Sequence, residues 1–484
     1  VLISGAAVMI LELTGSRILA PYLGTSLITW TSLIGVILGS LSVGYYLGGK
    51  MADKKASYQT FSLIMLLAGV FTALSAYLKD PLLKLIEISI PELRIATVIA
   101  TIVLFAPSSI LFGMVSPYAV KLKLSNIDKA GQTVGKLYAL STVGSILGTF
   151  LAGFVLIPLF GNSKLMILIA LAMVFCSILA YGKKLFTKII VGILAIVQLV
   201  VVANEEKNRA EAGILEVDSQ YNNIVVYDAI DKKTNEPIKM LSMGKTSHSA
   251  MFLNRDGLVF DYTKFYHLAK HFNPETKQSL ILGGGAYSYP KDYLENYPNG
   301  TLDVVEIDPE ITKIAKENFN LKEDPRLTIY HEDGRTFLNK NSKKYDTIFI
   351  DAFGNYYSIP YQLTTVEAIE KIYNSLNDDG IVLMNIIGTL DGPGSEFIKA
   401  EIKTFQEYFP QVYIFPVTDS LNQFLIQNHI VVALKSESKP GFTSENEELN
   451  SYLSHLWFEK IELDKEILTD DYAPVDQYVL SLIQ

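Results

Sequence analysis

Residues 279–308 read SLILGGGAYSYPKDYLENYPNGTLDVVEID, and this stretch decides the fold of the second half of the chain. A short apolar run leads into three glycines, and a second apolar run reaches an acid about 20 residues later. Short β-type runs separated by helical patterns are typical of a parallel sheet covered by helices on both faces. Ligands of such sheets bind beyond the carboxyl ends of the strands. The stretch therefore predicts both the architecture and the edge of the sheet at which a site lies.

The same alternation continues along the chain. Further β-type runs lie at 326–332, 345–352, 380–387, 411–417 and 428–434, with helical patterns such as 309–318 and 365–376 between them. Upstream, the short β-rich runs 222–230 and 237–243 predict a small hairpin domain. The second half is thus expected to be an α/β domain with a Rossmann-like, mostly parallel sheet that is preceded by a small β-hairpin domain.

The first 203 residues differ from the rest in hydropathy and charge. Hydrophobic residues make up 49% of the chain, 19% of its residues are charged, and the mean hydropathy is +0.27. Residues 1–203 hold 15 basic and 6 acidic residues, whereas residues 204–484 hold 26 and 44. Apolar stretches long enough to cross a bilayer lie near 1–22, 28–49, 58–78, 94–120, 137–160, 164–182 and 187–203. A multi-span α-helical membrane domain of about seven helices is therefore predicted.

Composition also excludes some partners. An acidic water-exposed half argues against nucleic acid, because phosphates require a basic surface. The single cysteine, Cys176, excludes an intrachain disulfide. No metal site is expected. Glu12 and Arg17 are the only charges inside the first span and are therefore candidates for a functional role, although a mutual ion pair or an Arg17 that extends to the membrane surface is the simpler interpretation.

The carboxyl ends of four predicted strands carry the candidate site. The first ends in three glycines, Gly283–285, which would let a ligand approach the backbone closely. The second ends in Glu306, at a spacing that suits a carboxylate binding both hydroxyls of a ribose. The third ends in Asp333, which could accept a hydrogen bond from an adenine amino group, and the fourth in Asp351. A single such acid is commonly a helix cap, but the four strand ends together indicate a nucleoside site.

These motifs resemble the spermidine synthase (polyamine aminopropyltransferase) family, and most of all its membrane-fused branch. The resemblance runs from Tyr221 to about Leu434 and continues in a motif near the C-terminus. The residues that carry it are Gln220-Tyr221-Asn222, Leu241, Gly244, His248-Ser249, Leu282-Gly283-Gly284-Gly285, Val305-Glu306-Ile307-Asp308-Pro309, Asp333-Gly334-Arg335, Ile350-Asp351-Ala352-Phe353 and Leu468-Thr469-Asp470-Asp471-Tyr472-Ala473-Pro474. The resemblance implies a sheet of class I methyltransferase type. It also implies S-adenosylmethionine or its decarboxylated form as substrate, with no further cofactor.

The resemblance further implies residue roles. Glu306 would bind the ribose, Asp333 would bind the adenine, and Asp351 stands at the position of the family's catalytic base. Tyr356, in the loop after that base, is the second catalytic candidate. The residues expected to contact the nucleoside are Asn222, His248, Gly283, Gly284, Gly285, Ala286, Glu306, Ile307, Asp333, Gly334 and Asp351.

The sequence departs from the family where the amines would bind. Ala286 replaces the Asp that holds the amino end of the aminopropyl group, and Gly354 replaces the Asp that binds the acceptor diamine. The family's glutamines are replaced by Asn222, by Ser247 or His248, and by Asn385. Loss of two carboxylates weakens the attraction for a dication. Tyrosines are abundant instead, and their ring faces could steady a sulfonium, although packing is an equally good explanation for Tyr287, Tyr289, Tyr356, Tyr357 and Tyr361.

Three hypotheses for the reaction remain open. In the first, which the missing acids favour, the enzyme takes intact S-adenosylmethionine and Asp351 holds its ammonium group. The substrate carboxylate then attacks its own γ-carbon and gives homoserine lactone and 5'-methylthioadenosine. In the second, the chain is a polyamine aminopropyltransferase that uses decarboxylated S-adenosylmethionine. In the third, the soluble half senses a nucleoside and regulates a membrane transporter.

These patterns predict four domains or segments of the chain and the cellular location of the protein. Residues 1–203 are expected to form the transmembrane domain, 204–256 a small β-rich domain, 257–436 the Rossmann-like nucleoside-binding domain and 437–484 a C-terminal extension. Lysine-rich loops after spans two, four and six predict cytoplasmic loops, and seven spans would then place the second half outside. Because the expected metabolite is cytosolic, we instead expect a multi-pass protein of the cell (inner) membrane with a cytoplasmic catalytic domain. Its partners would be a small sulfonium nucleoside and the lipid bilayer, and a homo-oligomer is compatible with the sequence.

Overall fold

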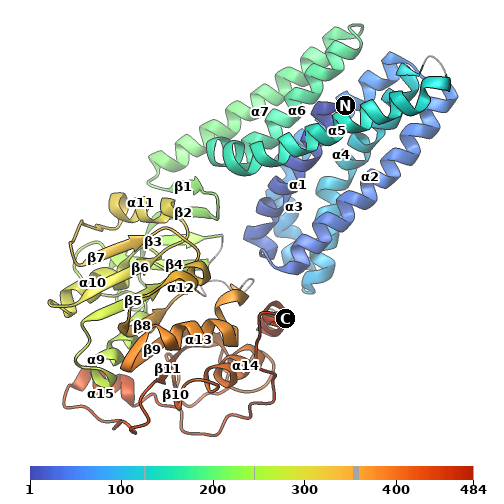
Figure 1. Ribbon diagram of the computed structural model, residues 1–484. Coiled ribbons are helices and arrows are strands. Elements are labelled where there is room, and N and C mark those ends of the chain that lie inside the picture. The colour runs from blue at the N-terminus through green and yellow to red at the C-terminus, as the bar shows by residue number, and fades with distance from the viewer. Residues whose placement is uncertain (125–126, 245, 353–358, 483–484) are drawn as a thin grey trace. The chain divides into compact units, whose positions relative to one another are not determined.

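The computed structural model describes residues 1–124, 127–244, 246–352 and 359–482. The chain divides into two compact units, Val1–Val225 and Val226–Gln484. The first is made mainly of long helices, and the second is an α/β domain (Figure 1).

Long apolar helices build the first unit. They are α1 (Leu2–Leu23), α2 (Leu27–Lys55), α3 (Tyr58–Ser89), α4 (Leu93–Lys123), α5 (Ala130–Leu151), α6 (Ile157–Ala180) and α7 (Leu185–Glu211), with the short 3₁₀ turn η1 (Ile127–Lys129) before α5. Within the described residues, six helices are long and apolar enough to cross a membrane when Ala130–Ala180 is taken as one helix. A continuous helix of that length would extend about 75 Å, more than twice the hydrocarbon thickness of a bilayer.

That long helix is interrupted twice. Residues Ala152–Leu156 form a π-helical turn, η2, and Gly161 leaves the helical conformation with φ +69°. The break at Gly161 falls between the two spans expected at 137–160 and 164–182. The two halves are therefore separate helical rods, and the number of membrane crossings stays a prediction.

Small residues allow some of these helices to approach closely. A side-chain carbon at Gly44 would lie 2.2 Å from the carbonyl oxygen of Ile110, which brings α2 against α4. At Gly144 it would lie 2.0 Å from the carbonyl oxygen of Leu2, which brings α1 against α5. Gly35 and Gly39, on the same helix as Gly44, meet no described atom within 4 Å. Close packing thus explains part of the glycine pattern, as expected for helices in lipid.

A small sheet follows the helices, with the strand order β1 (Leu215–Asp218), β2 (Asn223–Ile230), β3 (Pro237–Met243) and β4 (Thr246–Phe252). The sequence predicted only the second and third of these strands. β3 and β4 are antiparallel, and Gly244, which follows β3, has a φ of +61°. The strand β4 was missed because its sequence, Thr246–Phe252, mixes small polar residues with few β-branched ones.

The second unit is organised around a sheet of seven strands. They are β5 (Gln278–Leu282), β6 (Thr301–Val305), β7 (Leu327–Tyr330), β8 (Tyr345–Ile350), β9 (Leu376–Gly388), β10 (Gln411–Pro416) and β11 (Gln427–Leu434), in the order β10-β11-β9-β8-β5-β6-β7. The strands β5 to β9 are paired in parallel, whereas β11 runs antiparallel to both β9 and β10. This is the Rossmann-like, class I methyltransferase-type sheet, so the predicted fold class is confirmed.

Helices connect and cover these strands. The longer ones are α10 (Ser288–Asn296), α11 (Pro309–Asn318), α12 (Gly334–Lys340), α13 (Val366–Asn374), α14 (Glu396–Phe405) and α15 (Glu447–Leu453). Short turns are α8 (Asp261–Lys264), η3 (Phe265–Leu268), α9 (Ala269–Phe272), η4 (Tyr361–Leu363), α16 (Val475–Tyr478) and η5 (Val479–Leu482). One hydrophobic core joins β5, β8 and β9 with α12, α13 and α14, and the late residues Leu468, Val475 and Val479 are buried in it. The C-terminal residues therefore belong to the core of this unit.

Candidate active site

The chain order of the strands reverses between β5 and β8, and the predicted acids gather there. From β5 the chain passes outward to β6 and β7 and then returns to β8 on the other side of β5. The backbone N–H of Asp351 donates to the carbonyl of Leu282 over 2.9 Å, and that of Gly283 donates to Val305 over 2.9 Å. Hydrogen bonding thus continues past the strand ends. It brings Gly283, Glu306 and Asp351 to the edge at which such sheets bind ligands.

Glu306 is fixed at this edge by two backbone groups. Its Oε2 accepts from the N–H of Gly284 over 3.0 Å, and its Oε1 accepts from the N–H of Asp308 over 2.9 Å. A carboxylate offers about four acceptor positions, so Glu306 retains acceptor capacity for a ligand hydroxyl. Burial raises the pKa of Glu306 to about 6, against the lowering effect of these N–H groups. At neutral pH the side chain is therefore an ionised acceptor with capacity for a ligand hydroxyl.

Contacts within the protein explain why residues 283–285 are glycines. A side-chain carbon at Gly283, whose φ is +97°, would lie 2.5 Å from the carbonyl oxygen of Asp351. One at Gly285, whose φ is +49°, would lie 2.6 Å from Oγ of Ser249. At Gly284 it would lie 3.0 Å from the ring of Tyr287. The turn therefore requires glycine for its own packing, and ligand approach is not needed to account for these residues.

Asp333 is the N-cap of α12. Its Oδ1 accepts from the N–H of Thr336 over 2.9 Å, and its Oδ2 accepts from Nε2 of Gln362 over 3.3 Å. A side-chain carbon at the next residue, Gly334, would lie 3.3 Å from Leu363. The capping explanation for a single acid thus holds for Asp333. Its role toward an adenine stays a prediction.

Asp351 lies at the centre of a hydrogen-bond network of uncharged donors. Its Oδ1 accepts from Nδ2 of Asn385 over 3.1 Å, and its Oδ2 accepts from the hydroxyl of Tyr262 over 3.2 Å. The Oδ1 of Asn385 in turn accepts from Nδ2 of Asn428 over 2.8 Å, which fixes the orientation of the Asn385 amide. A chain from β11 through β9 therefore holds the carboxylate of Asp351 in one position.

This environment makes Asp351 more basic than an ordinary carboxylate. Burial raises the pKa of Asp351, and the hydrogen bonds from Asn385, Tyr262 and Tyr266 oppose that rise without cancelling it. Burial and the nearby carboxylate also raise the pKa of Tyr262, so this tyrosine stays protonated as the donor. The hydrogen bonds described for the Asp351 side chain come from neutral groups, Asn385, Tyr262 and Tyr266.

The other residues predicted to contact the nucleoside differ in burial and in hydrogen bonding. The Nε2 of His248 is buried without a hydrogen-bond partner among the described residues, and burial lowers the pKa of its imidazole to about 4, so it is neutral. Ala286 is fully buried, and its N–H donates to Oγ of Ser249 over 2.9 Å. Ile307, next to Glu306 in the sequence, is 37% exposed, and its contact with a base stays a prediction. Asn222 lies in the first unit.

The expectation that aromatic rings surround a sulfonium fails for two of the five tyrosines. Tyr287 is fully buried and its hydroxyl pairs with Oγ1 of Thr312 at 2.7 Å. Tyr289 is buried with its ring edge-on to Phe349, 4.9 Å between centroids. Both are packing residues. Tyr361 is 51% exposed. Tyr356, the second catalytic candidate, lies outside the described residues together with Tyr357 and Gly354.

Three contributors to the site were not predicted. Tyr262 on α8 reaches Asp351, and Tyr266, one turn later, lies close enough to influence its pKa. Ser249 on β4 holds the glycine turn through Ala286. The spacing of four between the two tyrosines places them on one face of a helical segment and was the available signal. The two tyrosines were missed because they precede the glycine run and belong to no acidic motif.

Asp470, in the motif near the C-terminus, contacts Arg335 and Thr365. The guanidinium of Arg335 pairs with the carboxylate of Asp470 at 2.7 Å and donates to the carbonyl of Gln362 over 3.0 Å. Thr365 Oγ1 donates to Asp470 over 2.7 Å. These contacts tie α12 and the start of α13 to the C-terminal residues, and they hold the segment that contains Gln362, the partner of Asp333.

Several known proteins are similar to parts of this chain. Residues 259–431 match the family model for the spermine/spermidine synthase domain. The polyamine aminopropyltransferase of Vibrio vulnificus is 29% identical over 237 residues, which cover 45% of this chain and 75% of that protein. Polyamine aminopropyltransferase 2 of Aquifex aeolicus is 22% identical over 414 residues, which cover 82% of this chain and 79% of that protein. The structure of a probable spermidine synthase from Corynebacterium glutamicum matches with 22% identity and a TM-score of 0.42, over 50% of this chain and 86% of that one.

The match to the Aquifex protein is longer than the second unit of this chain, so it also includes part of the helical unit. The family model, in contrast, lies wholly within the α/β unit that carries Glu306 and Asp351. These similarities support the spermidine synthase family for the α/β unit, through the domain at residues 259–431.

Proposed function

We propose that the chain is a membrane-integrated aminopropyltransferase, which moves the aminopropyl group of decarboxylated S-adenosylmethionine to an amine. The observation that carries the proposal is Asp351, a carboxylate of raised pKa fixed by Asn385 and Tyr262 at the strand-order reversal. The similarity to polyamine aminopropyltransferases supports this chemistry over cyclisation.

The reaction is a displacement at the carbon beside a sulfonium. The amine nitrogen forms a bond to that carbon, the carbon–sulfur electrons return to sulfur, and neutral 5'-methylthioadenosine leaves. The amine must lose one proton, and Asp351 is the group that accepts it. A raised pKa increases the basicity of Asp351, while the donors Tyr262 and Asn385 keep its carboxylate ionised and oriented.

The remaining residues bind and position the substrate. Glu306 has acceptor capacity left for the ribose hydroxyls, and Ile307 offers an apolar surface beside them. Positioning accounts for most of the rate in such a displacement, because the leaving group is already good. No further cofactor is needed for this step.

A second candidate is cyclisation of intact S-adenosylmethionine to homoserine lactone. One observation favours it: Ala286, buried and without charge, stands where the family holds the amino end of the aminopropyl group. In that reaction the substrate carboxylate is the nucleophile, so no proton is transferred to Asp351, which would bind the ammonium group instead.

One experiment separates the candidates. Full-length protein in nanodiscs is incubated with S-adenosylmethionine alone, and separately with its decarboxylated form and a set of amines, followed by mass spectrometry. An aminopropylated amine that forms together with methylthioadenosine supports the proposal. Homoserine lactone supports cyclisation. Binding of methylthioadenosine without turnover of either substrate would identify a sensor and overturn both. We place the α/β unit in the cytoplasm, where protease added to inside-out membrane vesicles should digest it.

A further inference from the structure

Helix α1 has a carboxylate at its middle. Glu12 lies about 15 Å along the helix from either end of α1, which is about half the hydrocarbon thickness of a bilayer. Other helices of the first unit pack around α1. The Oγ of Ser4 donates to the carbonyl of Phe112 on α4 over 3.2 Å, and Oγ of Ser145 on α5 donates to the carbonyl of Gly5 over 3.2 Å. A charged group at such a depth is costly and is seldom kept without a role.

The simplest expected partner of Glu12 is engaged elsewhere. Arg17 donates to the carbonyl of Ser219 over 2.7 Å and also to that of Gln220, so its side chain extends toward the polar end of α1. The mutual ion pair of Glu12 and Arg17 is therefore not formed. Within the described residues, the partly buried side chain of Glu12 makes no hydrogen bond and no ion pair.

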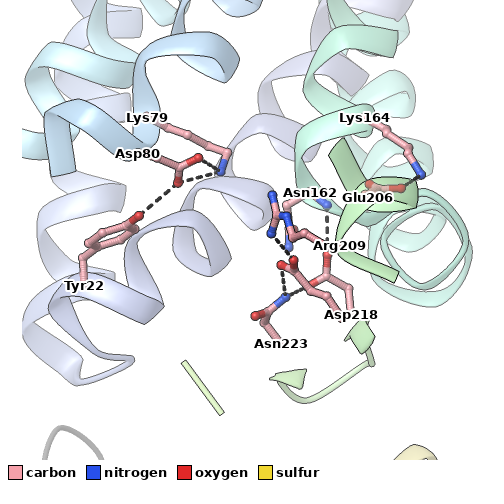
Figure 2. A network of polar contacts seen from close by, with 10 residues as sticks. Tyr22, Lys79, Asp80, Asn162, Lys164, Glu206, Arg209, Asp218 and Asn223 are labelled. Carbon is pink, nitrogen blue, oxygen red and sulfur yellow. Dashed lines mark hydrogen bonds and ion pairs between the residues drawn. The ribbon is translucent and has the colours of Figure 1, made fainter. Parts of the chain in front are cut away.

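Several other charged groups of the first unit do have partners. On α7, the buried ammonium of Lys188 donates to Oγ of Ser62 over 2.6 Å and to the carbonyl of Ser177 over 2.8 Å. Glu12 differs from these groups because no described residue neutralises its carboxylate. Figure 2 shows the end of the helices at which α1 stops, where three acids are paired: Asp80 with Tyr22 and Lys79, Glu206 with Lys164, and Asp218 with Asn162 and Asn223.

The interrupted helix formed by α5 and α6 lies beside α1 at the depth of Glu12. Ile10 and Leu13 flank Glu12 in the sequence. Both pack against a cluster that includes Ala152 and Ile157. Ala152 begins the π-helical turn η2, and Ile157 follows that turn directly. Such turns are frequent at functional sites, and interrupted helices near the middle of the membrane supply the binding sites of many transporters.

The surroundings of Glu12 favour an organic ammonium ion over a metal ion. Hard cations such as Ca²⁺ and Mg²⁺ require about six oxygen ligands. The neighbours Ile10 and Leu13 are apolar, and in the described part of the chain no three His, Cys, Asp or Glu side chains gather to hold a metal ion. An alkylammonium group needs only a charge-assisted hydrogen bond to the carboxylate, and its carbon chain suits apolar neighbours.

We infer that Glu12 binds an organic ammonium ion inside the helical unit, in competition with a proton, and that this site serves the passage of an amine across the membrane. Exchange of one ammonium group for one proton keeps the carboxylate neutralised, so a bare charge is never left in the hydrocarbon region. The choice of an amine rests on the proposed function, whose reaction consumes and forms amines. The helical unit would then have an activity of its own.

The first experiment labels Glu12 in full-length protein in nanodiscs with dicyclohexylcarbodiimide, an apolar reagent that modifies protonated carboxyl groups. Mass spectrometry of the peptides measures the labelling. Putrescine should slow the labelling of Glu12 saturably. Its half-protecting concentration should rise by up to about tenfold for each unit of falling pH, because ammonium and proton compete for one carboxylate. The matched control is 1,4-butanediol, which has the same carbon chain without charge and should not protect Glu12.

The second experiment measures uptake of radiolabelled putrescine into proteoliposomes with an acidic lumen. Glu12→Gln removes the charge and should lower uptake about tenfold or more, and Glu12→Asp should lie between the variant and the wild type. The control is Glu92→Gln, at the start of α4, where the carboxylate accepts from the N–H of Ile95 over 2.9 Å. This variant should transport like the wild type.

The outcomes separate this inference from the proposed function. If putrescine protects Glu12 no better than butanediol, or if labelling responds to pH alone, the inference is wrong while aminopropyl transfer by the same protein is unaffected. Protection combined with unchanged uptake in Glu12→Gln would overturn passage of the amine. Asp351→Asn should leave the protection of Glu12 unchanged. Protection of Glu12 in a wild type that forms no aminopropylated product would overturn the proposed function alone.

Discussion

The side-chain amide of Asn385 donates to Oδ1 of Asp351 over 3.1 Å and connects the end of β8 to the adjacent strand β9. Because Asn428 fixes the other end of that amide, Asn385 can present only its N–H group to the carboxylate. The position and basicity of Asp351 are therefore set by uncharged neighbours, and they can be altered without adding or removing a charge.

Removing this donor should shift the pH dependence of the reaction. Asp351 acts when ionised, so kcat/KM should rise as the pH increases through its pKa. The bond from Asn385 lowers that pKa, so Asn385→Ala should raise it and move the acidic limb of the pH profile to higher pH. The measurement is kcat/KM against pH for both proteins. An unmoved limb would show that Asp351 is not the titrating base.

Tyr262→Phe should act in the same direction, because its hydroxyl is the donor to Oδ2 of Asp351. We expect the acidic limb to move to higher pH and the turnover number to fall about tenfold, as a positioned donor is lost. The control is Tyr289→Phe, which removes a buried hydroxyl that has no hydrogen-bond partner among the described residues. If both variants change the profile equally, the effect comes from packing rather than from the bond to Asp351.

Asp351→Asn preserves the shape of the side chain and removes the base. Turnover should fall by roughly tenfold to a thousandfold, equivalent to about 1.4–4 kcal/mol of activation free energy. Methylthioadenosine should still bind, and the melting temperature at pH 7 should not fall, because an acid of raised pKa destabilises the folded state when it is ionised. Equal turnover in wild type and variant would exclude Asp351 from catalysis.

Glu306→Gln should weaken binding of methylthioadenosine by about 1–3 kcal/mol through loss of charge-assisted bonds to the ribose. Because burial raises the pKa of Glu306 to about 6, the affinity of the wild type should also fall as the pH drops below 6, while that of the variant should not. Calorimetry at pH 5, 6 and 8, values chosen as about one to two units around that pKa, measures both effects. Glu332→Gln, at a carboxylate paired with Lys340, is the control.

Arg335→Ala tests the link between α12 and the C-terminal motif. It removes the pair with Asp470 and the bond to Gln362, and we expect the free energy of unfolding to fall by about 1–2 kcal/mol, discounted for the half-exposed Asp470. Denaturant titration of the variant measures this. Lys340→Ala removes an exposed pair and should change stability by no more than about 0.5 kcal/mol. Equal effects would show that the Asp470 contact is not structural.

The amino-acid sequence alone determined the architecture of this protein. Alternation of β-type and helical runs predicted the parallel sheet, and the apolar stretches predicted the helices of the first unit. These signals are reliable because hydrophobic periodicity is local, and each element must bury its own apolar face. The acids Glu306 and Asp351 could be placed for the same reason, since the carboxyl ends of parallel strands meet at one edge.

Only the tertiary structure decided which side chains serve the site and which serve the core. Tyr287 and Tyr289 follow the glycines directly but are buried, whereas Tyr262, 89 residues before Asp351, is its hydrogen-bond donor. In the same way Arg17 finds its partner 202 residues later, at Ser219. Such contacts depend on the order in which strands and helices pack, which brings distant segments together. Local patterns in the sequence do not specify that order.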